Sequence, residues 1–79
     1  MKAIPARTIR EMLWRLGLRP RARGNATGHE VWVSPEGRAC KPKLRRKDMP
    51  MAVVFSLCRE MDSRGIVSSR QFWTALRAA

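Results

Sequence analysis

A short apolar stretch followed by a proline–glycine turn, at the centre of the chain, most constrains the fold. Residues 29–34 include the triplet Val31–Val33, and its β-branched and aromatic side chains favour a strand. The next segment, Ser34–Gly37, reads Ser-Pro-Glu-Gly, in which proline presets φ and glycine accepts a positive φ. The pattern predicts a β-hairpin whose return strand covers Arg38–Pro42.

A strand is predicted before this hairpin, over Leu18–Arg23, and it is either an edge strand or one that starts late, because Pro20 cannot donate a hydrogen bond to a ladder. Alternate side chains of a strand share a face, so Trp32 and His29 are expected on opposite faces of the strand over 29–34. Trp32 is the largest apolar group of this strand, so we expect the face that carries Trp32 to lie against the core. We therefore expect His29 on the open face, where a ligand can reach it.

Helical periodicity precedes the β-region. One apolar stripe follows the i, i+3, i+4, i+7 spacing of a helix face and consists of Ile9, Met12, Leu13 and Leu16. Thr8 and Glu11 have the spacing of a capping box, in which each side chain accepts a backbone N–H of the first turn. Gly17 then suits a left-handed stop. The pattern predicts a helix over residues 8–16.

Two further helices are expected after the basic stretch that ends at residue 47. Asp48 suits an N-cap and Pro50 suits the first turn of a helix over about residues 49–62. Its stripe comprises Met51, Val54, Phe55, Cys58 and Met61. Ser68 and Gln71 form a second capping-box pattern, which opens a short last helix with an apolar cluster.

The predicted order is α-β-β-β-α with a short helix at the end. This order is typical of an α+β chain, with a three-stranded antiparallel sheet and helices on one face. With 79 residues the chain makes one domain, 1–79. Chains of this size bury only about 60% of their unfolded surface. We therefore expect any chemistry at the surface or in a shallow groove.

The charge is large and uneven. The net charge is +11, with 13 Arg against 4 Lys, and residues 19–47 alone carry a net +7. An Arg guanidinium can donate two parallel hydrogen bonds to the oxygens of one phosphate group. A polyanionic partner is therefore expected, and nucleic acid is the first candidate. The residues predicted to bind RNA phosphates are Arg21, Arg23, Lys41, Lys43, Arg45, Arg46 and Lys47.

Several other classes of protein are disfavoured. Cys40 and Cys58 are not in a Cys-x-x-Cys pair, which leaves zinc unsupported, and both fit buried thiols of a reducing cytoplasm. The acidic residues form no two-metal pattern, and the sequence has no Gly-rich phosphate loop. Neither a signal peptide nor a membrane span is expected. We expect a cytoplasmic protein without cofactor or metal.

His29 is the one histidine of the chain, and it suits metal-free RNA cleavage. RNA supplies its own nucleophile, the 2′-hydroxyl, so cleavage requires proton transfer and charge stabilisation at phosphorus. One positioned general acid or base contributes roughly 10²–10⁴-fold in rate. Surrounding cations add electrostatic stabilisation of the transition state. The sequence thus indicates a slow ribonuclease with His29 as the catalytic residue.

The chain resembles the HicA family of bacterial toxins. The resemblance is carried by Thr27–Arg38, by the first helix and by Gly65–Phe72. The family hallmark is a Gly-Ser-His step that opens the second strand, followed by a Pro-Asp-Gly-Arg-like turn. Here Thr27-Gly28 stands before His29, and Pro35-Glu36-Gly37-Arg38 forms the turn segment.

The resemblance implies the following expectations. HicA proteins are small messenger-RNA interferases with a double-stranded-RNA-binding-like fold, and their strand histidine, His29 here, is catalytic. The family implies a type II toxin–antitoxin system with a HicB-like antitoxin, which masks the histidine and the basic face. An acidic partner suits the charge of +11.

Two alternatives remain open from the sequence. The first is a non-catalytic module that binds RNA or DNA, such as a phage-borne relative whose activity has drifted. The second is a protein-interaction subunit whose basic face binds an acidic protein, with Trp14 and Trp73 at the interface. Product formation from RNA separates both alternatives from the nuclease.

Overall fold

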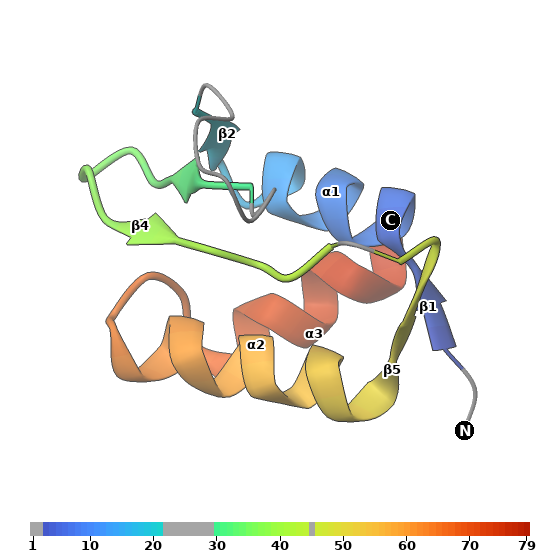
Figure 1. Ribbon diagram of the computed structural model, residues 1–79. Coiled ribbons are helices and arrows are strands. Elements are labelled where there is room, and N and C mark those ends of the chain that lie inside the picture. The colour runs from blue at the N-terminus through green and yellow to red at the C-terminus, as the bar shows by residue number, and fades with distance from the viewer. Residues whose placement is uncertain (1–2, 22–29, 45) are drawn as a thin grey trace.

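The computed structural model describes residues 3–21, 30–44 and 46–79 (Figure 1). This part of the chain is α+β, and a three-stranded antiparallel sheet in the order β2-β3-β4 is flanked by helices. The elements are α1 (Ala6–Arg15), β2 (Arg19–Pro20), β3 (Trp32–Val33), β4 (Ala39–Cys40), α2 (Met51–Ser63) and α3 (Ser69–Ala78). The predicted class, with its antiparallel sheet of three strands between helices, is confirmed. The last helix has 10 residues, as many as α1, and is not the short element predicted.

A second, two-stranded ladder was not predicted. The strands β1 (Ala3–Pro5) and β5 (Asp48–Pro50) pair antiparallel, with Ile4 opposite Met49 and Pro5 opposite Asp48. Each strand ends in a proline and leads directly into a helix, α1 or α2. The ladder therefore fixes the starts of two helices beside each other, although they lie far apart in the sequence.

This ladder corrects both predicted caps of the first two helices. The helix α1 begins at Ala6 after Pro5, and α2 begins at Met51 after Pro50, in each case without a side-chain cap. Thr8 lies inside α1, so the predicted capping box with Glu11 is wrong, and Asp48 belongs to β5. Proline presets the entry φ and has no N–H to satisfy, while the N–H of Ala6 donates to the carbonyl of Lys47 at 2.8 Å.

Other predicted boundaries are confirmed. The helix α1 is followed by Gly17, whose φ is +92°, in the left-handed region that glycine tolerates. At the start of α3 the Gln71 N–H donates to Ser68 Oγ at 3.2 Å, and the Ser68 N–H donates to Gln71 Oε1 at 2.9 Å. The capping box at residues 68–71 therefore forms as the sequence predicts.

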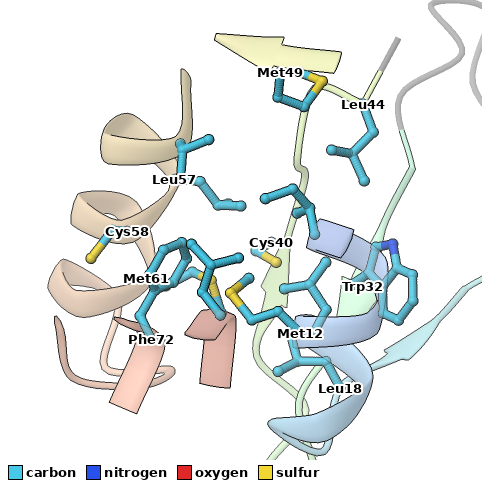
Figure 2. Packing of buried hydrophobic residues seen from close by; sticks show 14 of the residues in the cluster. Met12, Leu18, Trp32, Cys40, Leu44, Met49, Leu57, Cys58, Met61 and Phe72 are labelled. Carbon is cyan, nitrogen blue, oxygen red and sulfur yellow. The ribbon is translucent and has the colours of Figure 1, made fainter. Parts of the chain in front are cut away.

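The core lies between the three-stranded sheet and the helices. Trp32 is 4% exposed, and its ladder partner Cys40 is 0% exposed, so these two define the inner face of the sheet. Met12 of α1, Met61 of α2 and Phe72 of α3 belong to the same cluster (Figure 2). The prediction that Trp32 faces the core is confirmed.

Burial gives Cys40 a pH-dependent role in stability. Burial first, and then the charge of Glu60, raises the pKa of the Cys40 thiol to about 11, whereas Arg64 lowers it. The folded state therefore keeps a proton that the unfolded chain releases near pH 9. Stability from this thiol is complete below about pH 9 and is lost as pH rises towards about 11.

We expect the free energy of unfolding to fall by about 2 kcal/mol between about pH 8 and pH 10.5 because of Cys40. Urea denaturation at both pH values measures this change. The variant Cys40→Ala keeps every lysine and arginine, so it reports the pH-dependence of the remaining groups. An equal loss in the two proteins would contradict the assignment to Cys40.

Candidate nucleic-acid interface

A basic groove of about 540 Å³ lies at the start of α1. One wall comes from the end of β1 and the first turns of α1, and the other comes from the segment that enters β5. We call it the α1 groove, and its lining consists of Pro5, Ala6, Arg7, Arg10, Leu44, Arg46, Lys47 and Asp48. Four of these side chains are cationic, and Asp48 is the one acid among them. The pairing of Pro5 with Asp48 brings the two walls together.

The backbone of α1 adds to the positive character of the groove. The helix has no acidic residue in its first turn and no side-chain cap. The N-terminus of a helix carries about half a positive charge and directs N–H groups outward, which favours anions. Arg7, Arg46 and Lys47 are exposed around it. The groove therefore has the charge, the hydrogen-bond donors and the access to bind a phosphate group.

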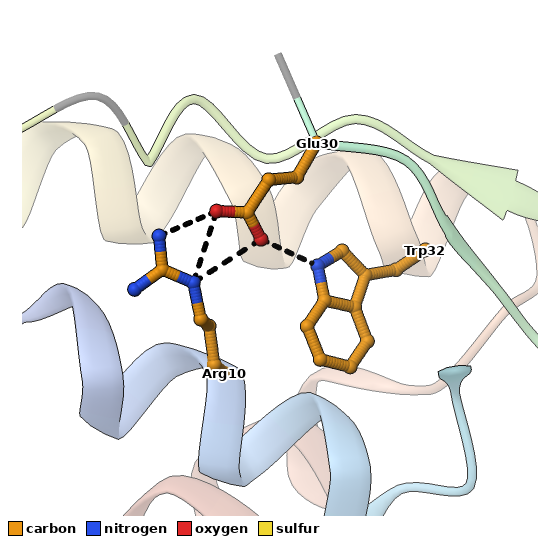
Figure 3. A network of polar contacts seen from close by, with 3 residues as sticks. All are labelled: Arg10, Glu30 and Trp32. Atoms are coloured by element: carbon orange, nitrogen blue, oxygen red, sulfur yellow. Dashed lines mark hydrogen bonds and ion pairs between the residues drawn. The ribbon is translucent and has the colours of Figure 1, made fainter. Parts of the chain in front are cut away.

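An ion pair joins this groove to the sheet (Figure 3). Arg10 Nε donates to Glu30 Oε2 at 2.9 Å and to Oε1 at 3.2 Å, and Arg10 Nη2 also donates to Oε2. Trp32 Nε1 donates to Glu30 Oε1 at 3.0 Å. The hydrogen bond to Glu30 raises the pKa of Arg10 above its usual value. Glu30, two residues before the buried Trp32, is thus fixed against the wall of the groove.

Four of the predicted RNA-binding residues divide between two surfaces. Arg46 and Lys47 line the α1 groove. Lys41 and Lys43 line a separate hollow of about 220 Å³, which we call the α2 hollow and whose other residues are Pro42, Ala52, Val53, Ser56, Leu57 and Glu60. Arg21 is exposed, and its backbone N–H donates to the carbonyl of Val31 at 2.7 Å.

Three of the predicted site residues lie outside the described residues. They are the catalytic candidate His29 and the phosphate ligands Arg23 and Arg45. Glu30, which follows His29 in the sequence, is described and is held by Arg10. The position of the chain immediately after His29 is therefore known.

Sequence reasoning missed Arg7 and Arg10, which line the groove with Arg46 and Lys47. A local signal was present, because Arg7 and Arg10 are three residues apart and lie outside the apolar stripe of the helix. Arg46 and Lys47, on the other wall of the groove, are about forty residues away in the sequence, however. Only the pairing of β1 with β5 brings the two walls close.

A metal-binding group, a membrane-spanning helix or a similarity to known proteins would each bear on the class of this site. Among the described residues, no three His, Cys, Asp or Glu side chains gather in a group fit to hold a metal ion. Over the same ranges, no helix has the length and apolar character needed to cross a bilayer. Comparison with protein-family models, with curated proteins and with solved structures finds no match to this chain.

Proposed function

We propose that this protein is a metal-independent endoribonuclease of the cytoplasm, with His29 as its proton-transfer residue. It would act as the toxin of a type II toxin–antitoxin pair, and a HicB-like antitoxin would be its protein partner. The proposal includes a double-stranded-RNA-binding-like fold, for which the antiparallel order β2-β3-β4 between α1 and α2 is the support.

The observation that carries the proposal is the link between the α1 groove and Glu30. Arg10 belongs to the lining of the groove and also pairs with Glu30, the residue that follows His29 in the sequence. A phosphate bound in the groove would therefore lie close to the chain position next to the one imidazole. A general base and a cluster of cations are the two requirements of metal-free RNA cleavage.

The reaction balances with the groups that RNA and the protein supply. The 2′-oxygen attacks the adjacent phosphorus, the O2′–P bond forms and the P–O5′ bond breaks, which leaves a cyclic phosphate and a free 5′-hydroxyl. His29 would transfer one of the two protons, and solvent or a lysine such as Lys47 would transfer the other. Arg7 and Arg46 would stabilise the negative charge that develops on the phosphoryl oxygens.

Charge supports an acidic antitoxin. The chain carries +11, and its exposed cations include Arg7, Arg46 and Lys47 around the groove. A partner with acidic side chains would neutralise these cations and exclude RNA from the same surface. Complementary potentials of this kind raise association rates and suppress wrong partners.

Incubation of RNA with the purified protein in excess chelator tests the proposal. We expect cleavage products with a cyclic phosphate end from the wild type. The double variant Arg46→Gln/Lys47→Gln should cleave about 10–100-fold more slowly, because two hydrogen bonds from exposed side chains to phosphate, each worth about 1 kcal/mol, are lost. Its RNA affinity should also depend less on salt, with a slope reduced by roughly 1.4.

The matched control is Lys41→Gln/Lys43→Gln, which removes the same charge from the α2 hollow. We expect this control to change cleavage by less than about 3-fold, since Lys41 and Lys43 do not line the α1 groove and act on a phosphate bound there only through solvent-screened electrostatics. An equal effect of the two double variants would remove the groove from the mechanism. Binding without any product would make the protein a non-catalytic RNA-binding module.

A further inference from the structure

A second feature of α1 has the form of a base-binding site. Trp14 is 51% exposed, although it is a large apolar side chain. The guanidinium carbon of Arg19, the first residue of β2, lies 3.6 Å from the centroid of the Trp14 ring. The indole therefore carries a cation on one face and is open to solvent over much of the rest.

The Arg19 guanidinium is held in place by neutral groups. Its Nη1 donates to the carbonyl of Trp14 at 3.1 Å and to the carbonyl of Leu18 at 2.7 Å. Neither contact supplies a negative charge, so these bonds fix the guanidinium and leave its positive charge uncompensated. The result is a preorganised pair of planar groups, one aromatic and one cationic, on the surface.

The pair lies in line with the α1 groove. Arg7, Arg10 and Trp14 occupy positions i, i+3 and i+7 of α1, which share one side of a helix. The axial rise from Arg7 to Trp14 is about 10 Å. A strand whose phosphate sits in the groove would therefore meet the indole further along the same helix side.

We propose that Trp14, backed by Arg19, is a stacking site for an unpaired nucleobase of RNA. Single-stranded RNA is recognised by bases splayed onto aromatic rings and Arg planes, because every base has a π-face. The inference rests on the proposed function and deepens it, since it makes single-stranded RNA the preferred substrate. Base-paired RNA keeps its bases stacked within the helix and offers no free face to the indole.

Phe55 provides the matched control. It is 50% exposed, close to the value for Trp14, but it lies on α2 and its ring packs 5.3 Å from that of Trp73. No cation is recorded over its ring in the described part of the chain. Loss of Phe55 therefore removes a similar exposed aromatic group without touching α1.

The test measures the affinity of each protein for a labelled 2′-O-methyl oligoadenylate of about 12 nucleotides. The methyl group blocks the 2′-oxygen, so the probe binds without being cleaved. We expect Trp14→Leu to weaken binding about 10-fold, and Trp14→Phe to restore most of the loss, because stacking on one ring is worth that much. Phe55→Leu should leave the affinity unchanged.

Two further readouts separate stacking from other causes. The salt dependence should be the same for Trp14→Leu and the wild type, since no phosphate contact is lost. Affinity for the duplex of the same oligomer with its complement should also be unchanged. Equal affinity of Trp14→Leu and wild type for the single strand would overturn the stacking site, while cleavage would still decide the nuclease proposal. An equal loss of affinity of Trp14→Leu for the single strand and for the duplex would also overturn the stacking site.

Discussion

Replacement of His29 by alanine is expected to reduce RNA cleavage in chelator by roughly 10²–10⁴-fold, which is the contribution of one positioned general acid or base. Alanine removes the one imidazole of the chain and alters none of the cations of the α1 groove. Affinity for the uncleavable 2′-O-methyl oligomer should therefore stay within about 2-fold of the wild-type value, because the phosphate contacts that dominate affinity remain. Growth arrest on expression should disappear together with cleavage.

The control for this variant is its stability, because a misfolded protein would also lose activity. Urea denaturation of His29→Ala and of the wild type supplies this control, and the loss of cleavage is assigned to the imidazole when the two proteins unfold at the same urea concentration. The variant Glu30→Gln is a second control. It removes the carboxylate charge that pairs with Arg10 but keeps the imidazole of His29, so it separates the effect of the ion pair from the effect of the imidazole. Full cleavage by His29→Ala would eliminate the proposed mechanism.

The second large effect is expected in the core. Phe72→Ala should destabilise the protein by about 3–5 kcal/mol, the usual cost of removing a buried aromatic ring. Phe72 is 0% exposed and packs edge-on against Trp73 at 5.1 Å. Natural domains have only about 5–15 kcal/mol in total, and small ones lie at the low end. We therefore expect a melting temperature lower by about 15–30 °C.

Thermal unfolding followed by circular dichroism, with urea denaturation at 25 °C as a second measurement, checks this prediction. The half-exposed Phe55 again serves as the control, because Phe55→Ala should cost less than about 1 kcal/mol. Similar losses for the two variants would mean that Phe72 is not buried in the hydrophobic core as the structure describes.

Much of this architecture could be predicted from local patterns. The apolar spacing of Ile9, Met12 and Leu13 predicted α1, and the Ser68–Gln71 capping box predicted the start of α3. The hairpin was predictable because Gly37, with a φ of +88°, and the preceding proline suit a tight turn. In each case the residues that determine the structure lie within one turn of helix or one strand.

The ladder between β1 and β5 could not be predicted in this way. Each strand has three residues and ends in proline, so neither shows the alternation that marks a strand. Their pairing depends on the packing of Ile4 and Met49 against the same core, which is a long-range effect. The α1 groove could not be predicted for the same reason, because its two walls meet only through that ladder. The catalytic assignment of His29 stays a prediction from sequence.

The β1–β5 ladder also determines when during synthesis the groove forms. Ala6 donates its N–H to the carbonyl of Lys47, and Pro5 faces Asp48 across the ladder. A nascent chain that ends before residue 47 has Arg7 and Arg10 but lacks the opposite wall. The complete α1 groove should therefore form late, only after β5 has left the ribosome.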